Sequence, residues 1–428
     1  MRIAFLTTDN RDAHRRYDDP DPYFGPAPTA LLEGFAMLGG RKNPEIEKLG
    51  NDEIGTSGSI ELGTRNEEPR KPPEERRTTN YQLQTVPPFE IHVISCTQRP
   101  LRAPEKIAPN IWYHSLHVPK IGWLRTGYQG CIREVRRKLR EIDPDIVHGQ
   151  GTERDCAISA VLSGYPNVLT IHGNMRSVAR ALGAKPGSFY WLAGKLERFA
   201  LARTRGVFCN SEYTRSMVGT IAADTWLVPN ALCTAFFANI PSKTRGKDPL
   251  LLSAGTISPY KQQLECLGMM SRLHRKGHRF VVNFVGSLDA ESNYGKKFLQ
   301  EIRKAEKMGY ARYLGNIGVQ DLIDRLDDAV ALVHVPSEEA FGLVVAEALA
   351  RNVRVFGFSV GGMPDIARGI EGAELMAPHD WEGLEGSISL WISKGAKITE
   401  NSAETMRLRY HPEVIARRHL EIYSQVAR

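Results

Sequence analysis

The sequence predicts an α/β protein with two Rossmann-like domains that face each other across a central cleft. Short apolar runs rich in β-forming residues alternate with segments of helical periodicity, which is typical of parallel sheets covered by helices. The alternation pauses between residues 228 and 249, in a stretch rich in proline and charge, and then restarts. A chain of 428 residues, of which 42% are hydrophobic and 25% charged, is long enough for two globular domains.

The first half of the chain contains seven apolar runs with strand character and a clear helix among them. Ile132, Val135 and Leu139 recur at helical spacing, and Pro144 ends that helix. The predicted strands span residues 3–7, 89–95, 111–116, 145–148, 168–171, 206–209 and 225–228. We therefore expect residues 1–240 to form an N-terminal Rossmann-like domain.

The second half repeats the pattern with five strands and four helices. The predicted strands span residues 250–253, 280–285, 311–314, 329–335 and 353–356. The predicted helices span residues 262–276, 295–307, 319–327 and 341–350. We expect residues 241–408 to form a C-terminal Rossmann-like domain, and residues 409–428 to form a helix that packs back on the N-terminal domain. Ligands of such sheets bind at the carboxyl ends of the strands, so the facing edges should hold the site.

Residues 41–88 follow neither pattern. This stretch contains six prolines and four glycines, mixes both signs of charge and has few apolar residues. Such a segment cannot bury enough apolar surface to offset the entropy lost on ordering. We predict that it is a disordered insertion in the first domain.

Composition excludes several classes of function. The six cysteines form no C-x-x-C pair, which indicates reduced thiols in the cytoplasm and no zinc site. A net charge of +7 is compatible with anionic small molecules and is weak evidence for nucleic acid. The Asp-Pro-Asp runs at residues 19–21 and 143–145 fit turns better than metal ligands. We therefore expect a cytoplasmic enzyme with no metal, no cofactor and no nucleic-acid partner.

One helix carries a basic cluster, namely Arg133, Arg136, Arg137, Lys138 and Arg140. Glu134 and Glu141 lie among these residues and balance part of the charge. A solvated helix face explains the cluster better than a membrane dock. A weak peripheral contact with an anionic membrane remains an open alternative.

The segment 337–350 has the strongest chemical signal. A strand ends before it, a turn contains Glu339, and a helix begins near residue 341. The first amides of that helix, those of Gly342 and Leu343, have no helical partner and favour a phosphate group. Glu347 lies eight residues after Glu339, slightly more than two helical turns, so both carboxylates can face one side. Two carboxylates beside a phosphate-binding helix end suit the hydroxyls of a sugar and a ribose.

This segment resembles the E-x7-E motif of the retaining glycosyltransferases of family 4, which have the GT-B fold. An apolar strand at residues 353–358 and the run VGGMPD at residues 360–365 follow it, as in that family. The run VPNA at residues 228–231 is similar to the family's V-P-N-G at the domain join. The resemblance covers nearly the whole chain apart from residues 41–88.

Lys261 follows the first strand of the second half and a glycine turn, which places its ammonium group at the edge of the cleft. The family usually has G-R-x4-K here, with both cations on the leaving diphosphate. Lys261 matches that pattern, but Thr256 stands where the family has arginine. Another arginine or a hydrogen bond from Thr256 would have to compensate, or activity would be lower.

Two further candidates lie in the first domain. His172 follows the strand at residues 168–171 and precedes a glycine, and the family has a histidine at such a strand end, close to the reacting sugar. Gly25 lies in a loop that resembles the family's glycine-containing loop after the first strand. We expect His172 to approach the donor sugar from the acceptor side, and Gly25 to contact substrate.

The resemblance implies that a sugar moves from a nucleotide-diphosphate-sugar donor to a hydroxyl acceptor, with the anomeric configuration kept. Lys261 and the amides of Gly342 and Leu343 would hold the diphosphate. Glu339 would orient the sugar hydroxyls, and Glu347 would bind the ribose. The acceptor remains open between a glycan, a lipid-linked sugar and a small molecule. Two alternatives also remain, a nucleotide-sugar 2-epimerase and a non-catalytic nucleotide-sugar-binding protein.

Overall fold

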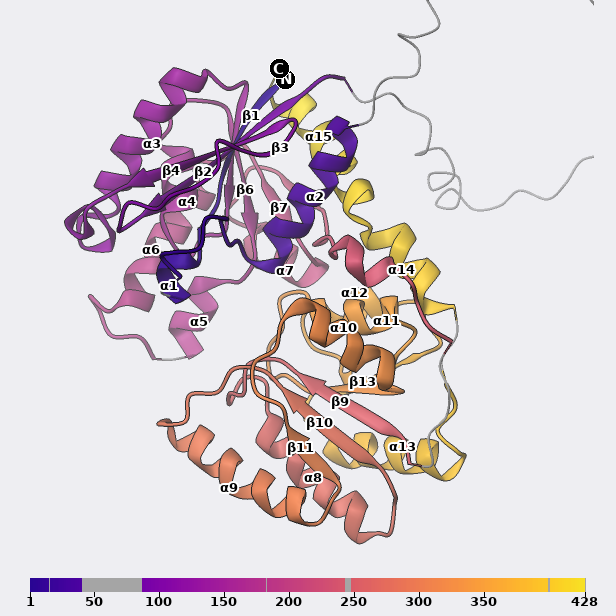
Figure 1. Cartoon of the computed structure of the whole chain (residues 1–428). Helices are drawn as coiled ribbons and strands as arrows, with labels where there is room; N and C mark the ends of the chain where they lie inside the picture. The colour runs from indigo at the N-terminus through magenta and orange to yellow at the C-terminus, as the bar shows by residue number, and fades with distance from the viewer. Residues whose placement is uncertain (15, 41–86, 182, 243–247, 399–400, 428) are drawn as a thin grey trace, which may run out of the picture.

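The computed structural model describes all residues except 15, 41–86, 182, 243–247, 399–400 and 428. The predicted disordered insertion, 41–88, therefore lies outside the described residues apart from its last two prolines. The described chain forms two α/β domains, each with its own sheet (Figure 1). The predicted class, two Rossmann-like α/β domains, is confirmed.

The first domain contains an eight-stranded sheet in the order β3-β4-β2-β1-β5-β6-β7-β8. Its strands are β1 (Arg2–Leu6), β2 (Glu90–Thr97), β3 (Lys106–Ala108), β4 (Ile111–His117), β5 (Ile146–Gln150), β6 (Asn167–Ile171), β7 (Val207–Cys209) and β8 (Thr225–Leu227). All neighbouring pairs are parallel except β3 and β4. The three-residue edge strand β3 was not predicted, because it has no apolar pattern of its own and exists through pairing with β4.

Helices surround this sheet. They are α1 (Arg11–His14), α2 (Pro26–Gly40), α3 (Gln129–Ile142), α4 (Asp155–Val161), α5 (Met175–Ala181), α6 (Phe189–Leu201) and α7 (Glu212–Val218). Short 3₁₀ turns are η2 (Lys120–Gly122) and η3 (Leu124–Thr126), while η4 (Thr234–Phe237) packs its phenylalanines into the core of the second domain. On α3 the basic cluster forms exposed ion pairs, with Arg137 within 3.1 Å of both Glu134 and Glu141. These contacts are those of a solvated, charge-balanced helix face.

The second domain contains a six-stranded parallel sheet in the order β11-β10-β9-β12-β13-β14. Its strands are β9 (Leu250–Ala254), β10 (Val281–Val285), β11 (Ala311–Tyr313), β12 (Ala331–His334), β13 (Arg354–Phe358) and β14 (Ala373–Met376). Its helices are α8 (Gln263–Arg275), α9 (Asn293–Lys307), α10 (Val319–Asp328), α11 (Leu343–Ala350), α12 (Met363–Ala367), α13 (Trp381–Ser393) and α14 (Ser402–Tyr410). The edge strand β14 is half-buried and was not predicted, because like β3 it has no apolar pattern of its own and depends on pairing with its neighbour.

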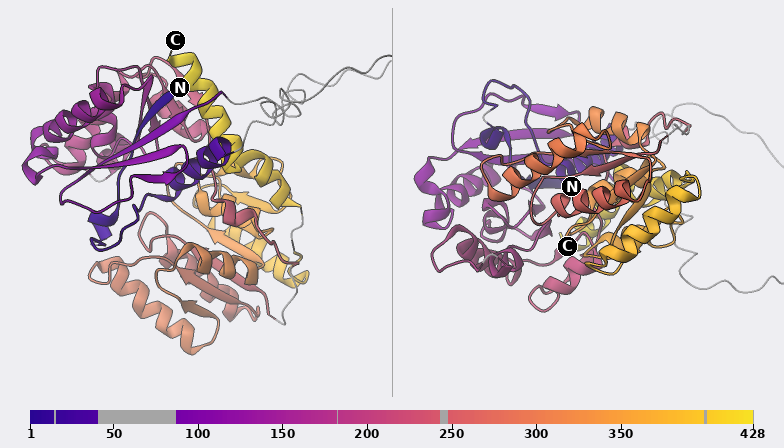
Figure 2. Two further views of the ribbon diagram at one scale, coloured as in Figure 1. Left: turned by 45° about the horizontal axis from the view of Figure 1, so that its top comes forward. Right: turned by 90° about the horizontal axis from the view of Figure 1, so that it is seen from below.

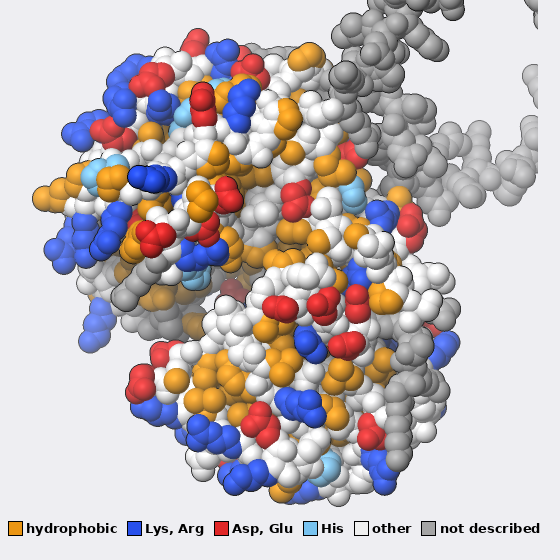
Figure 3. Space-filling view, in the orientation of Figure 1, with side chains coloured by type: hydrophobic (Ala, Val, Ile, Leu, Met, Phe, Trp, Pro, Cys, Tyr) orange, Lys and Arg blue, Asp and Glu red, His pale blue; other side chains and the backbone are white. Residues whose placement is uncertain are grey.

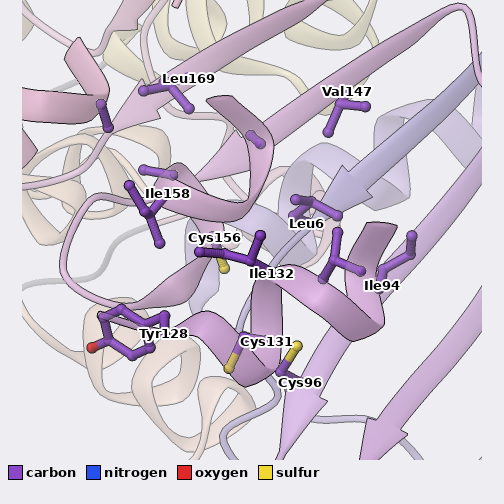
Figure 4. Close-up of a cluster of buried hydrophobic side chains, with 14 of the residues drawn as sticks. Leu6, Ile94, Cys96, Tyr128, Cys131, Ile132, Val147, Cys156, Ile158 and Leu169 are labelled. Carbon is purple, nitrogen blue, oxygen red and sulfur yellow. The ribbon is translucent and has the colours of Figure 1, made fainter. Parts of the chain in front are cut away.

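The core of the first domain lies on both faces of its sheet. Figure 4 shows one of these clusters, in which Leu6, Ile94 and Ile132 pack together. Cys96 and Cys131 also lie there, and their sulfur atoms come within 4.8 Å of the buried Asp155 carboxylate. A hydrogen bond with Cys131, together with burial, raises the pKa of the Cys96 thiol well above its ordinary value. That thiol is therefore protonated at neutral pH, as expected of a core residue.

The C-terminal helix α15 (Pro412–Val426) leaves the second domain and packs against α2 of the first (Figures 1 and 2). Ile415, Ala416 and Tyr423 are buried in the first domain's core on this side. Arg205 donates a hydrogen bond of 2.6 Å to the carbonyl oxygen of Val426, close to the end of the chain. The two domains are thus joined twice, by the linker near residue 240 and by the passage from α14 to α15.

Among the described residues, no helix combines the length and apolar character that crossing a bilayer requires.

Candidate active site between the two domains

A cavity of about 1260 Å³ lies between the domains, at the carboxyl ends of both sheets. This volume exceeds the range of roughly 300–1,000 Å³ that is usual for a pocket holding one small ligand. Figure 3 shows the hollow between the domains, with apolar and acidic side chains along its edge. The eight predicted site residues all lie on its wall, namely Gly25, His172, Thr256, Lys261, Glu339, Gly342, Leu343 and Glu347. Their roles remain predictions.

Glu339 lies in the turn between β12 and α11, where it meets two other side chains. Its Oε2 atom is 2.5 Å from Nζ of Lys261 and 3.1 Å from Nε2 of His334. Burial alone would raise the pKa of the Glu339 carboxyl, but the His334 hydrogen bond and the Lys261 charge outweigh burial and lower it to about 2. The side chain is therefore a carboxylate at neutral pH, held in one place by two donors.

Burial also sets the state of His334, which ends β12 and is 3% exposed. Desolvation lowers the pKa of its imidazole, and the nearby Lys261 charge acts in the same direction. A neutral His334 can donate its Nε2 hydrogen to the carboxylate. His334 was not among the site residues predicted from the sequence. A histidine at the end of an otherwise apolar strand was the available signal, because that position faces the edge where ligands bind.

Two glycines shape the turn around Glu339. Gly342 precedes the first residue of α11 and has φ = 100°, a conformation that side chains other than glycine rarely adopt. Gly361 has φ = 56°, and a Cβ atom placed on it would lie 1.5 Å from the carbonyl oxygen of Glu339. The backbone of the loop after β13 can therefore press directly against the turn. The helix begins two residues later than predicted, with the amides of Gly342 and Leu343 at its N-terminus.

Glu347 lies one turn deeper along α11, with 9% of its surface exposed. Among the described residues, no side chain forms a hydrogen bond or ion pair with its carboxylate. Burial raises the pKa of this carboxyl to about 7. Because buried carboxylates are normally paired, this group on a cavity wall is suited to a ligand hydroxyl.

Lys261 is positioned by the turn that follows β9. The Gln263 side chain donates hydrogen bonds to the carbonyl oxygens of Gly255 and Thr256, which fold the turn back toward α8. Thr256 is exposed, and its hydroxyl lies 3.3 Å from that of Ser287. Among the described residues, the other lysine and arginine side chains on the cavity wall are Lys106 and Arg154. Both belong to the first domain.

His172 follows the last residue of β6, on the wall opposite Lys261. Its Nε2 atom lies 3.1 Å from Oε1 of Gln150, the last residue of β5. Burial lowers the pKa of the His172 imidazole, against a smaller opposing effect of Glu153.

Gly25 lies on the same side of the cavity as His172, just before α2, and its carbonyl accepts a hydrogen bond of 3.1 Å from the amide of Thr29. A Cβ atom placed on Gly25 would lie 3.8 Å from Pro28, which is an ordinary van der Waals contact. A larger side chain would therefore cause no steric clash at its Cβ atom.

Comparison with protein families gives two matches that lie side by side on the chain. Residues 88–236 match the family described as Glycosyltransferase Family 4, and residues 237–407 match that described as Glycosyl transferases group 1. A relative from Caenorhabditis elegans, named GDP-Man:Man(3)GlcNAc(2)-PP-Dol alpha-1,2-mannosyltransferase, is 28% identical over 199 residues. These residues are 43% of this chain and 40% of the relative, so the match spans less than half of that protein.

Solved structures share the architecture over the whole length. Sucrose-phosphate synthase from Thermosynechococcus elongatus is 14% identical, with a TM-score of 0.67 over 100% of this chain and 99% of that one. A glycosyltransferase from Rickettsia africae is 13% identical, with a TM-score of 0.63, and the match covers 99% of this chain and 98% of that one. The Anabaena protein HepE, in complex with UDP and glucose, is 16% identical, with a TM-score of 0.60, and the match covers 99% of this chain and 100% of that one. From the two family matches and this shared architecture, the chain belongs to the glycosyltransferases of family 4 and has the GT-B fold.

Proposed function

We propose that the protein transfers a sugar from a nucleotide-diphosphate-sugar donor to a hydroxyl acceptor and keeps the anomeric configuration. The observation that carries this proposal is the Lys261–Glu339 pair beside the N-terminus of α11, inside the cavity between the domains. A cation, a helix N-terminus and oriented carboxylates are the groups that a sugar diphosphate needs. The family membership supports the same chemistry.

The donor would lie mainly on the second domain. The Lys261 ammonium has three hydrogens, so it can keep its bond to Glu339 and still donate to a diphosphate oxygen. The amides of Gly342 and Leu343 would receive another phosphate oxygen at the start of α11. Glu339 would accept hydrogen bonds from the sugar hydroxyls, and the unpaired Glu347 carboxylate would accept them from the ribose.

Transfer with retention follows if the acceptor hydroxyl attacks the anomeric carbon from the face that the diphosphate leaves. The bond from the anomeric carbon to the diphosphate oxygen breaks, and a bond to the acceptor oxygen forms. The departing diphosphate takes the proton of the acceptor hydroxyl. Lys261 and the helix amides would stabilise the negative charge as it develops on the diphosphate, which is the largest contribution this site can make.

The acceptor would lie against the first domain. Much of that wall is apolar, including Phe24, Leu32, Ile107 and Ile111. The relative from Caenorhabditis elegans is named for an acceptor with a dolichol group. We infer that the acceptor here also has an apolar part, as a lipid-linked sugar has. The donor base and sugar stay open between those of that relative and the UDP and glucose bound by HepE.

We also propose that the protein is located in the cytoplasm, because all six of its cysteines are free thiols in the structure.

A transfer assay tests the proposed function. The protein is incubated with UDP-, GDP- and ADP-sugars and with lipid-linked and water-soluble acceptors, and products are identified by mass spectrometry and by NMR of the new glycosidic bond. A product with the donor's anomeric configuration is the expected result. Release of an epimerised free sugar without acceptor would indicate the 2-epimerase, and donor binding with no turnover on any acceptor would indicate the non-catalytic binding protein.

A further inference from the structure

Behind His172, a row of buried polar side chains crosses the first sheet. Gln150 Nε2 lies 3.1 Å from Nε2 of His148 and 3.2 Å from the hydroxyl of Thr170. His148 Nε2 lies 2.7 Å from the same hydroxyl, and its Nδ1 atom forms a short hydrogen bond with the hydroxyl of Tyr423 on α15. The row thus runs from the C-terminal helix to His172 on the cavity wall.

In the structure the Gln150 amide has a defined orientation within this row. Its NH₂ group faces the Thr170 hydroxyl and the His148 ring, both of which can accept a hydrogen bond. Its carbonyl oxygen therefore faces His172 and accepts from the Nε2 atom of that ring. In this orientation the Thr170 hydroxyl accepts from the amide and donates to Nε2 of His148, whose own ring hydrogen then lies on Nδ1, toward Tyr423.

The far end of the row is itself held rigidly. His148 is fully buried, and its ring stacks on Phe208 with centroids 4.9 Å apart. The His419 ring stacks on Phe208, with centroids 4.5 Å apart, and on His148, with centroids 5.7 Å apart. Burial lowers the pKa of the His148 imidazole well below its ordinary value, so this ring is neutral. The partners of Gln150 therefore change neither place nor charge at neutral pH.

The tautomer of His172 follows from this arrangement. A neutral histidine has one ring hydrogen, and the Gln150 carbonyl keeps it on Nε2. Nδ1 is then an acceptor, and among the described residues it has no hydrogen-bond partner, while the residue lines the cavity. A sugar hydroxyl is a donor that this atom can bind.

We propose that Gln150 is a positioning residue, which orients the His172 ring and holds it in the Nε2–H tautomer so that Nδ1 accepts a hydrogen bond from a substrate hydroxyl. The proposal rests on the proposed function for the identity of the substrate. The ring orientation and the tautomer themselves are properties of the free protein.

A double-mutant cycle tests whether Gln150 acts through His172. Gln150→Leu removes both hydrogen-bonding ends of the side chain and should lower kcat about tenfold or more, as loss of the groups that orient functional histidines does. The KM for donor should change less than kcat. In a His172→Ala background, the same Gln150→Leu change should cost less than twofold. An equal loss of rate with and without His172 would show that Gln150 touches the substrate itself and would overturn the proposal.

The conservative variant Gln150→Glu separates the two ends of the side chain. Its carboxylate still accepts from Nε2 of His172, so it should recover part of the rate that Gln150→Leu loses. Thr204→Val is the matched control, because Thr204 is also buried and donates to carbonyls of Asn167 and Gly206 at the other end of the sheet. The control should keep the wild-type kcat. Equal rates for Gln150→Glu and Gln150→Leu would contradict a role as acceptor.

An NMR measurement on the free protein needs no turnover. In ¹⁵N-histidine-labelled protein, the signals of His172 are those that disappear in His172→Ala, and they should show one tautomer with the hydrogen on Nε2. In Gln150→Leu this single state should be lost, and in Thr204→Val it should remain. A hydrogen on Nδ1, or an unchanged tautomer in Gln150→Leu, would refute the proposal. Failure to find any transfer product would instead count against the proposed function alone.

Discussion

The carboxylates of Glu339 and Glu347 lie on one cavity wall but in opposite electrostatic environments. Lys261 and His334 surround the first, and no described side chain pairs with the second. Their pKa values differ accordingly, at about 2 for Glu339 and about 7 for Glu347. A motif of two glutamates therefore supplies one permanent carboxylate and one that is available to a ligand.

Replacing Lys261 tests the leaving-group role. Lys261→Ala should lower kcat by ~10²–10³, since loss of one preorganised charge contact commonly costs that much. The exposed Lys296, which pairs with Glu291 on the outer surface, offers a matched control, and Lys296→Ala should retain wild-type kcat. Steady-state kinetics with a donor that the protein binds measures both. Wild-type turnover in Lys261→Ala would remove this residue from the mechanism.

The raised pKa of Glu347 predicts that the stability of the folded protein depends on pH. Its folded-state pKa of about 7 lies above the ordinary value of 4.5, so the folded protein binds this proton more tightly than the unfolded chain. The stabilising contribution of the protonated Glu347 to the unfolding free energy is fully present below pH 4.5 and is lost as the pH rises through 7. The loss amounts to roughly 3 kcal/mol of unfolding free energy, at 1.36 kcal/mol for each pKa unit.

Glu347→Gln should abolish this loss, because an amide does not ionise. Urea unfolding at several pH values between 4.5 and 8.5 measures the effect, and the exposed Glu421→Gln is the control that should keep the wild-type slope. Identical pH dependence in wild type and Glu347→Gln would mean that the folded protein keeps this carboxyl near its ordinary pKa.

Among the secondary-structure elements, the loops after β12 and β13 support each other through backbone contact. The amide of Gly362 donates a hydrogen bond of 3.1 Å to the carbonyl oxygen of Glu339. Helix α11, which begins after the first of these loops, is anchored at its other end by Arg351. This buried guanidinium pairs with Asp327 of α10 at 2.5 Å and donates to linker carbonyls of Ala238 and Asn239. Helix α11 is therefore held at both of its ends.

Gly361→Ala should displace this turn. The added Cβ atom would overlap the Glu339 carbonyl oxygen, in addition to the strain of a positive φ. Gly369→Ala is a matched control, because Gly369 also has a positive φ, of 73°, but a Cβ there meets nothing closer than 3.9 Å. Both variants should lose stability in thermal unfolding, and Gly361→Ala should also lose most transfer activity per folded molecule. Equal activity in the two folded variants would contradict the steric argument.

Across the whole molecule, helix α7 of the first domain touches the loops that surround Glu339. Ser211 Oγ donates to the carbonyl oxygen of Ala340 at 2.6 Å, and Tyr213 donates to Glu338 at 2.9 Å. The amide of Glu212 donates to Asp365 at 2.8 Å. These contacts couple the loops around Glu339 to the domain that holds His172. A ligand spanning the cavity should therefore stabilise both domains together.

Donor binding should raise the melting temperature by mass action. At a hundred times Kd, a bound donor adds about 2.7 kcal/mol to the unfolding free energy. The matching nucleotide sugar should give the same shift with and without EDTA, because in the proposed function Lys261 and the α11 amides would provide the positive charge for the diphosphate. Differential scanning fluorimetry with UDP-, GDP- and ADP-sugars measures this. A shift that EDTA removes would show that a divalent cation takes part in donor binding.

Much of the architecture was predictable from the sequence because strand and helix periodicity are local properties. The pattern located seven of the eight described strands of the first sheet and five of the six in the second. Glu339, Gly342 and Lys261 were predicted at the cleft because each follows a strand, and parallel sheets bring such positions to one edge. Glu347 was predicted there from its spacing of slightly more than two helical turns from Glu339. Strands β3 and β14 were missed, since short edge strands owe their existence to a neighbour rather than to their own residues.

Pairing across the fold was not predictable. His334 ends an apolar strand, and Gln150 ends a strand whose other polar residue is His148. Nothing in these local patterns shows that His334 would meet Glu339 or that Gln150 would meet His172. The same holds for Tyr423, which lies 275 residues from its partner His148. The sequence by itself determined which groups the protein could use and which sheet edges would present them. The three-dimensional packing determined their partners, charge states and orientations, because these depend on burial and on distances between segments that are remote along the chain.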